Sequence, residues 1–373
     1  GVARPCAGRP VFLRAVRCRL AASLPFARGG RAAAGCRAVL WRGGVARTKT
    51  YAYLYPARSR EERADCCQQT EKTKRMKRLL TLLAALPMAA LLMTACGNDN
   101  GRKAPVTIVD RSVLYCESTY PYEGGVLIAN FGSEPLDPLN TLGRGYILHY
   151  KAGEEPRLLI PADGHLSAPR GMYLRDGWLF ICDVNQIVVY DLRTTGSEPR
   201  IIPLPEGELF VNDLAADGND LYASVTNTGR IFRIDISDPS NPGEPQLWLS
   251  IPGPNGLLVR DGVMYVASYS PDGKPGAEHV IYRIASLQEP VAEPFVTVPG
   301  QYDGLAFSGD GKSLYVTNWS PAGISRIDLQ SRTIEPVELD LEQPLVGPAD
   351  LSVADGVVYV PDLPNSRVVI FNE

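Results

Sequence analysis

The chain has 373 residues, of which 45% are hydrophobic and 21% are charged. This balance excludes a wholly disordered chain and an integral membrane protein, and it supplies enough apolar side chains for a large core. The net charge of −3 hides an asymmetry, because residues 1–75 hold 17 Lys or Arg against 4 Asp or Glu, whereas residues 97–373 hold 19 against 37. The acidic second part speaks against nucleic acid and anionic membrane surfaces as partners.

Residues 1–75 precede the first methionine, Met76, and show neither an apolar period nor strand-like alternation. We interpret them as upstream sequence translated from a start placed too early, and we expect them to be disordered. The alternative is a basic arm that binds nucleic acid. Aromatic and basic residues do not interleave there in a recognition pattern, so we favour the first interpretation.

Residues 76–95 have the pattern of a secretory signal peptide: a charged start at Lys77 and Arg78, an apolar stretch over 79–93, and small residues before Cys96. The apolar stretch, about 15 residues long, is too short to span a bilayer comfortably. The sequence Leu-Met-Thr-Ala-Cys at 92–96 resembles a bacterial lipobox, although Met93 stands where Leu is usual. The resemblance implies that Cys96 becomes the acylated first residue of the mature protein; a chance cysteine is the alternative.

Residues 96–105 form the predicted tether, since the polar run at 97–101 suits a flexible linker and gives no reason for retention in the inner membrane. We therefore expect a protein of the bacterial cell envelope, anchored to the outer membrane through its lipid alone. Two further cysteines remain in the mature chain, Cys116 and Cys182. Cys182 lies within an apolar strand pattern, so we expect no disulfide framework.

An internal repeat dominates residues 106–373. A turn motif followed by a short apolar strand recurs five times. The equivalent position of the turn falls at residues 170, 212, 255, 303 and 349. Steps of 40 to 50 residues with several short strands each are typical of propeller blades. Asp-Gly pairs recur between the first two strands of these units, where tight hairpins need the positive φ that glycine adopts easily.

A sixth unit precedes these five, beginning at Glu117 and continuing through apolar strands at 126–130 and 146–150. The last unit has no room for a fourth strand, which would leave an exposed edge. The strand-like segment 106–114 is predicted to supply that strand. The fold class is therefore all-β, a six-bladed propeller with an N-terminal strand closing the last blade, and we expect a monomer.

One register position is polar in five of the six units. It precedes each innermost strand and is therefore expected at one mouth of the central channel, where it is occupied by Glu117, Arg170, Asn212, Asn255, Asp303 and Ala349. Two carboxylates and two amide oxygens are hard ligands suited to Ca²⁺ or Mg²⁺. No Cys or His joins them, which argues against a structural Zn²⁺ site and thiolate chemistry. We expect Ca²⁺, with Mg²⁺ and Zn²⁺ as the alternative cofactors.

Here the sequence resembles the gluconolactonase and senescence-marker-protein family, six-bladed propellers with one divalent metal at the channel mouth; some loops are also similar to NHL-type blades. The resemblance spans roughly residues 112–372 and implies metal ligands at Glu117, Asn255 and Asp303, with Asn212 binding metal water or substrate. The family's Arg near Asn212 and its Trp in blade 1 are missing. Arg170 could supply the lost positive charge and bind substrate.

Two functions are open. The first is a metal-dependent hydrolase of a lactone or ester, with Asp303, Asp213 or Asp350 as general base. Because a bound metal depresses the pKa of an Asp ligand, we prefer the ligand role for Asp303. The second is a non-catalytic surface propeller that binds a glycan, peptide or protein at its mouth. In either case the expected partner is a small molecule, a glycan or a protein at the mouth, and fold alone does not separate the two.

Overall fold

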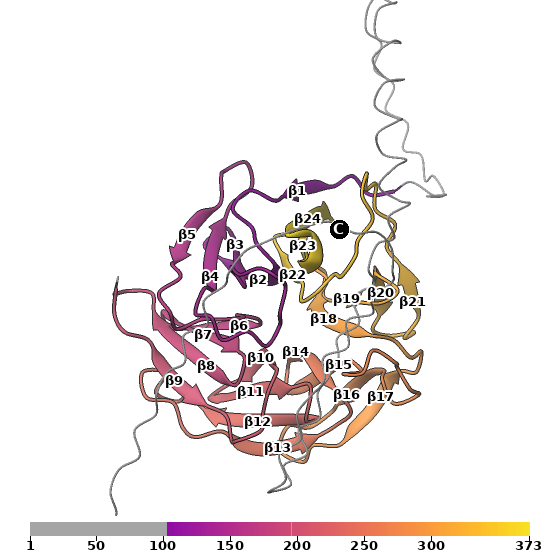
Figure 1. Cartoon of the computed structure of the whole chain (residues 1–373). Coiled ribbons are helices and arrows are strands. Elements are labelled where there is room, and N and C mark those ends of the chain that lie inside the picture. Colours follow the sequence, from indigo (N-terminus) through magenta and orange to yellow (C-terminus); the bar gives the residue numbers. More distant parts are fainter. Residues whose placement is uncertain (1–102, 195) are drawn as a thin grey trace, which may run out of the picture. The chain divides into compact units, whose positions relative to one another are not determined.

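The structure, a computed structural model, describes residues 103–194 and 196–373. Three predictions from the sequence fall outside these residues: the upstream sequence (1–75), the signal peptide (76–95) and the lipid on Cys96. Within the described part, no helix is long and apolar enough to cross a membrane. Its strands form six four-stranded antiparallel sheets arranged as the blades of a propeller (Figure 1). The predicted fold class is confirmed.

Each of the first five blades is a run of consecutive strands, ordered from the channel outward. Blade 1 comprises β2 (Cys116–Tyr122), β3 (Gly125–Asn130), β4 (Tyr146–Tyr150) and β5 (Arg157–Ile160). Blade 2 comprises β6 (Met172–Arg175), β7 (Trp178–Asp183), β8 (Gln186–Asp191) and β9 (Arg200–Pro203). Blade 3 comprises β10 (Val211–Asp217), β11 (Asp220–Val225), β12 (Arg230–Asp235) and β13 (Gln246–Ser250).

The second half of the ring repeats this order. Blade 4 comprises β14 (Pro254–Arg260), β15 (Val263–Ser268), β16 (Ile281–Ile284) and β17 (Ala292–Val296). Blade 5 comprises β18 (Tyr302–Phe307), β19 (Ser313–Asn318), β20 (Gly323–Asp328) and β21 (Ile334–Pro336). Blade 6 comprises β22 (Ser352–Ala354), β23 (Val357–Asp362) and β24 (Arg367–Asn372), with a 3₁₀ turn, η2 (Leu363–Asn365), before β24.

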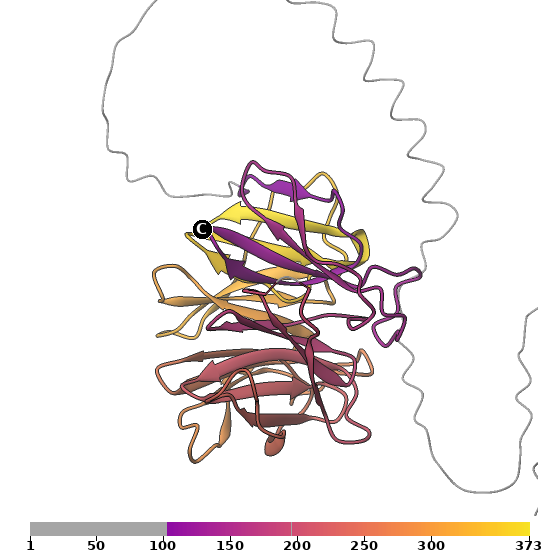
Figure 2. The ribbon, with the colours of Figure 1, turned by 90° about the vertical axis from the view of Figure 1, so that its left-hand side faces the viewer.

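The ring is closed by the N-terminal segment, as predicted. Strand β1 (Thr107–Val109) pairs antiparallel with β24, with Ile108 opposite Val369, and becomes the outermost strand of blade 6. Figure 2 shows the indigo start of the described residues beside the yellow C-terminal strands in this blade. The pairing removes an edge that would otherwise present free backbone groups to solvent.

The core lies between neighbouring blades. Side chains from adjacent sheets form clusters around the ring; one joins Phe180 and Ile187 of blade 2 to Leu221 and Phe232 of blade 3, all nearly or fully buried. Both cysteines of the propeller are buried and free, which confirms the expectation of no disulfide framework. Because blades pack through their broad faces, the innermost strands are held at the channel with fixed spacing.

Candidate functional site at the channel mouth

The six residues of the predicted ring meet in one cavity. Glu117, Arg170, Asn212, Asn255, Asp303 and Ala349, one from each blade, all line it. Its volume is about 40 Å³. This is room for an ion and a few waters, and far below the roughly 300–1,000 Å³ of sites that enclose drug-sized ligands.

β-Bulges bring these side chains to the mouth. In blade 3, Val211 pairs with Val225 and Leu214 with Ala223, so two residues, Asn212 and Asp213, lie opposite only Ser224 on β11. The same irregularity occurs in blades 4 and 5, between Pro254 and Leu257 and between Tyr302 and Leu305. Bulges interrupt the alternation of a strand and redirect its side chains, and they are frequent beside functional sites.

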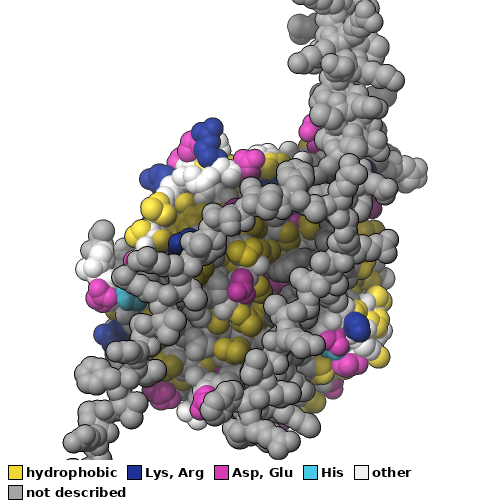
Figure 3. Space-filling model, in the orientation of Figure 1, with side chains coloured by type: hydrophobic (Ala, Val, Ile, Leu, Met, Phe, Trp, Pro, Cys, Tyr) yellow, Lys and Arg dark blue, Asp and Glu magenta, His cyan; other side chains and the backbone are white. Residues whose placement is uncertain are grey.

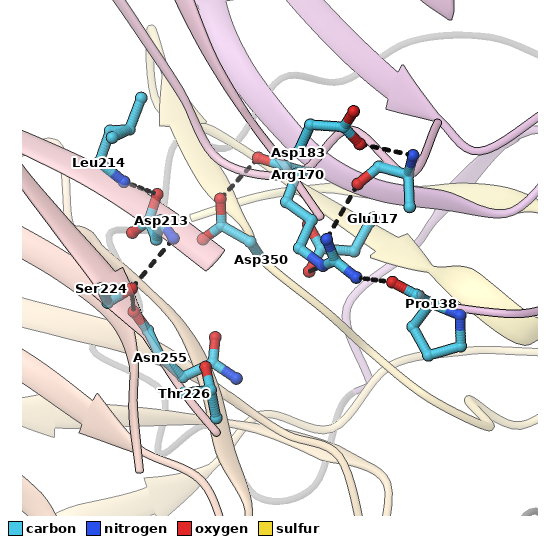
Figure 4. Close-up of polar contacts among 12 residues, drawn as sticks. Glu117, Pro138, Arg170, Asp183, Asp213, Leu214, Ser224, Thr226, Asn255 and Asp350 are labelled. Carbon is cyan, nitrogen blue, oxygen red and sulfur yellow. Dashed lines mark hydrogen bonds and ion pairs between the residues drawn. The ribbon is translucent and has the colours of Figure 1, made fainter. Parts of the chain in front are cut away.

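Hydroxyl groups of the second strands fix the bulges to the next blade. Ser224 Oγ accepts a hydrogen bond from the backbone N–H of Asp213 (3.0 Å) and donates one to the carbonyl oxygen of Asn255 (2.6 Å). Thr317 does the same between Gly304 and Ala349, each at 2.8 Å. The mouth is thus positioned by buried cross-blade bonds (Figure 4).

Four side-chain oxygens of the ring are buried and accept no hydrogen bond within the described residues: Glu117 Oε2, Asn212 Oδ1, Asn255 Oδ1 and Asp303 Oδ1. Their side chains are at most 5% exposed. An unsatisfied buried polar group costs about 1–3 kcal/mol, so four acceptors on one cavity would be stabilised by a cation or by water placed there.

The charges of the mouth do not balance. Burial raises the pKa of Glu117 well above its usual range, the negative charge of Asp303 raises it further, and Arg170 opposes the shift. Burial, and then the charge of Asp213, raise the pKa of Asp303 to about 7. A positive charge placed between the two acids would reverse both shifts.

Arg170 is the basic side chain of the mouth and is fully buried. Its Nη1 donates to the carbonyl oxygen of Ala168 at 3.0 Å, its Nη2 donates to that of Pro138, and its guanidinium lies 4.2 Å from the ring centre of Phe210. Its Nε has no hydrogen-bond partner within residues 103–194 and 196–373 and lies 4.0 Å from Glu117 Oε1. Phe210, which directly precedes β10 of blade 3, therefore stacks on the arginine of the neighbouring blade.

Asp213 and Asp350, the other two candidate bases, do not line the mouth cavity. Each follows a ring position and lines a second cavity further along the innermost strands. Asp213 accepts the backbone N–H groups of Leu214 (2.7 Å) and Leu257 (2.6 Å), whereas Asp350 accepts the hydroxyl of Ser118 (2.6 Å). Of the three acids, only Asp303 faces the mouth.

The rim of the mouth is apolar and largely aromatic, and this rim was not predicted from the sequence. Phe131, Tyr269, Trp319 and Leu363 line the cavity, and each directly follows the second strand of its blade. This shared register is visible in the sequence and could have revealed the rim. Figure 3 shows one face of the propeller, with hydrophobic side chains and acidic ones among them near its centre.

The donor set suits a hard cation. Among the residues with described positions, no three His, Cys, Asp or Glu side chains gather closely enough to hold a metal. A cation held by the two carboxylates would need the amide oxygens of Asn212 and Asn255 as further ligands, and such oxygens are typical of Ca²⁺ sites. A Zn²⁺ site with nitrogen or sulfur ligands does not fit these residues.

Comparisons with known proteins concern the fold alone. No protein-family model and no curated protein matches the sequence. A solved structure of a Bacteroides thetaiotaomicron protein of unknown function is similar at 13% identity with a TM-score of 0.50, over 70% of each chain. Two structures of virginiamycin B lyase from Staphylococcus aureus, one an inactive variant with quinupristin, align at 15% identity with TM-scores of 0.48 and 0.49, over 72% of this chain and 99% of theirs. At such identities a likeness shows the fold alone, so function has to be argued from the mouth itself.

Proposed function

We propose that the channel mouth binds a divalent cation, Ca²⁺ in the first place, and that the protein is a metal-dependent hydrolase of a lactone or similar ester. The observation that carries the proposal is the group of four unpartnered, buried oxygens contributed by four blades. Glu117, Asn212, Asn255 and Asp303 would hold the cation. When bound, it would supply Lewis-acid polarisation of an ester carbonyl.

Arg170 would stabilise negative charge on the substrate. Its Nε is a guanidinium nitrogen with no hydrogen-bond partner among the described residues, and two carbonyl oxygens and Phe210 hold the group in place. A fixed donor in a water-poor site stabilises a developing oxyanion without reorganising. The organic part of a substrate would lie over the apolar rim, because the cavity itself admits only an ion and a few waters.

A second candidate is a non-catalytic propeller that binds a glycan, peptide or protein. The observation in its favour is the position of Asp213 and Asp350 beyond the mouth, since this leaves no mouth carboxylate free for proton transfer once Glu117 and Asp303 serve as ligands. Aromatic side chains such as Trp319 at the rim would then suit a sugar ring.

A lactone panel followed with a pH indicator, at saturating Ca²⁺ and with EGTA, tests the proposal. We expect Ca²⁺-dependent turnover that Glu117→Gln abolishes and that Asp261→Asn, an exposed hairpin substitution, leaves unchanged. Ca²⁺ binding without turnover of any lactone or ester would favour the binding propeller. Failure to bind Ca²⁺ would remove the hydrolase proposal.

We further propose that the mature protein is attached to the outer membrane of a bacterial envelope through a lipid on Cys96. The support is the sequence pattern around that residue. The propeller would be held by a short tether and reach its partners as a monomer.

A further inference from the structure

A second cavity lies within the channel, beyond the mouth. It is lined by residues that follow the ring positions on the innermost strands, such as Thr119, Leu214, Leu258, Leu305 and Val353. Its volume is about 280 Å³, several times that of the mouth cavity and close to the lower limit for organic-ligand sites. Its walls are mainly aliphatic, so water gains few hydrogen bonds from them.

Two carboxylates form the polar end of this cavity. Asp213 comes from blade 3 and Asp350 from blade 6, which are opposite blades of a six-membered ring. Glycines leave the space that they occupy: a Cβ on Gly171 would lie 2.2 Å from Asp213 Oδ1, and one on Gly304 would lie 2.6 Å from Asp350 Oδ1.

The two carboxylates differ in their hydrogen bonds. Both oxygens of Asp213 accept backbone N–H groups. Asp350 accepts one bond, from Ser118 to Oδ2, and its Oδ1 receives none from any described residue. Asp350 is 6% exposed and lines the cavity, so a side chain more than nine-tenths buried offers an open acceptor to the interior.

No basic side chain balances these acids from within the cavity. Among its described lining residues there is no Lys, Arg or His, and the guanidinium of Arg170 is held at the mouth. A buried carboxylate beside a second one is stabilised by a cationic partner with hydrogen atoms to donate.

We propose that this cavity is a second ligand site, which binds a primary ammonium group carrying a short apolar chain. The ammonium would donate to Asp350 Oδ1, close to the charge of Asp213, and the chain would lie against the aliphatic walls. An alcohol of the same length lacks the charge, and a carboxylate of the same length would be repelled. The residues that line it are distinct from those that line the mouth cavity.

Calorimetric titration with n-hexylammonium, 1-hexanol and hexanoate tests the proposal on the mature protein. We expect hexylammonium to bind at least about tenfold more tightly than hexanol, as a charge-assisted bond provides, with no detectable binding of hexanoate. Asp350→Asn should weaken hexylammonium binding about tenfold or more. It retains an oxygen for Ser118, and circular dichroism verifies that it folds.

Asp261→Asn, on an exposed hairpin that lines neither cavity, is the matched control, and it should change hexylammonium affinity less than about twofold. Equal affinities for hexylammonium and hexanol, or no binding of hexylammonium, would overturn the proposal. A loss of binding in Glu117→Gln with none in Asp350→Asn would place the ammonium at the mouth and overturn it as well. None of these outcomes bears on Ca²⁺ binding or lactone turnover.

Discussion

Arg170 Nε lies 4.0 Å from Glu117 Oε1, and the arginine is fully buried beside a glutamate that is 5% exposed. The arginine is thus the positive group inside a mouth formed by acids and amides. Its remaining donors are held by backbone carbonyls of Ala168 and Pro138, so its position does not depend on Glu117 alone.

Replacing Arg170 by methionine should lower the free energy of unfolding by about 3–5 kcal/mol, because breaking a buried pair leaves Glu117 without compensation. Urea unfolding at pH 7 measures the change. Arg193→Met is the control, since that arginine is 56% exposed over Trp178 and should matter by less than about 0.5 kcal/mol. Similar losses in the two variants would show that the buried arginine has no special role.

Stability without metal should fall as pH rises from about 4 to about 7. The pKa of Asp303 is raised to about 7 in the folded protein, against roughly 3.9 when unfolded, so the folded state binds more protons across this interval. In EGTA, the melting temperature should be higher at pH 5 than at pH 8. Ca²⁺ should reduce the difference by stabilising the ionised acids at pH 8.

Asp303→Asn removes a carboxyl group whose pKa is raised in the folded protein. The melting temperature of this variant in EGTA should therefore change less with pH. Asp261→Asn, on an exposed hairpin, should leave this pH dependence as in the wild type. A melting temperature that rises steadily from pH 4 to pH 8 without metal would contradict the account of the buried acids.

The fold was predictable because short sequence patterns determine its strands and hairpins. Asp-Gly hairpins and apolar strands repeat at blade spacing, and the deficit of one strand at the C-terminus predicted the role of β1. The ring of six residues was predictable for the same reason. The sequence did not predict that Asn212 lines the mouth cavity while Asp213 lines the second cavity. A bulge turns these neighbouring side chains to different cavities, and its position depends on strand pairing rather than on residue type.

Removal of the closing strand should destabilise the propeller. A chain that starts at Arg111 lacks β1, exposes the edge of β24 and loses the buried side chain of Val109. Burial of one valine is worth roughly 1.5–3 kcal/mol, so we expect a loss of at least that size in urea unfolding. The free edge should also cause concentration-dependent association in size-exclusion chromatography. A chain that starts at Lys103 is the control and should remain monomeric.

Lipid attachment at Cys96 predicts partition with membranes. In a bacterial host, the wild type should incorporate labelled palmitate and sediment with the outer-membrane fraction, whereas Cys96→Ser should do neither. Unlabelled wild-type protein would exclude the anchor.

Calorimetric titration of the wild type and Asp303→Asn with Ca²⁺ at pH 8 tests the central claim most directly. We expect one site per chain in the wild type, with affinity at least about a hundredfold weaker in Asp303→Asn, because a charged ligand to a hard cation is lost. Asp261→Asn should bind as the wild type does. No heat of binding in the wild type, or equal affinity in Asp303→Asn, would contradict a cation site at the channel mouth.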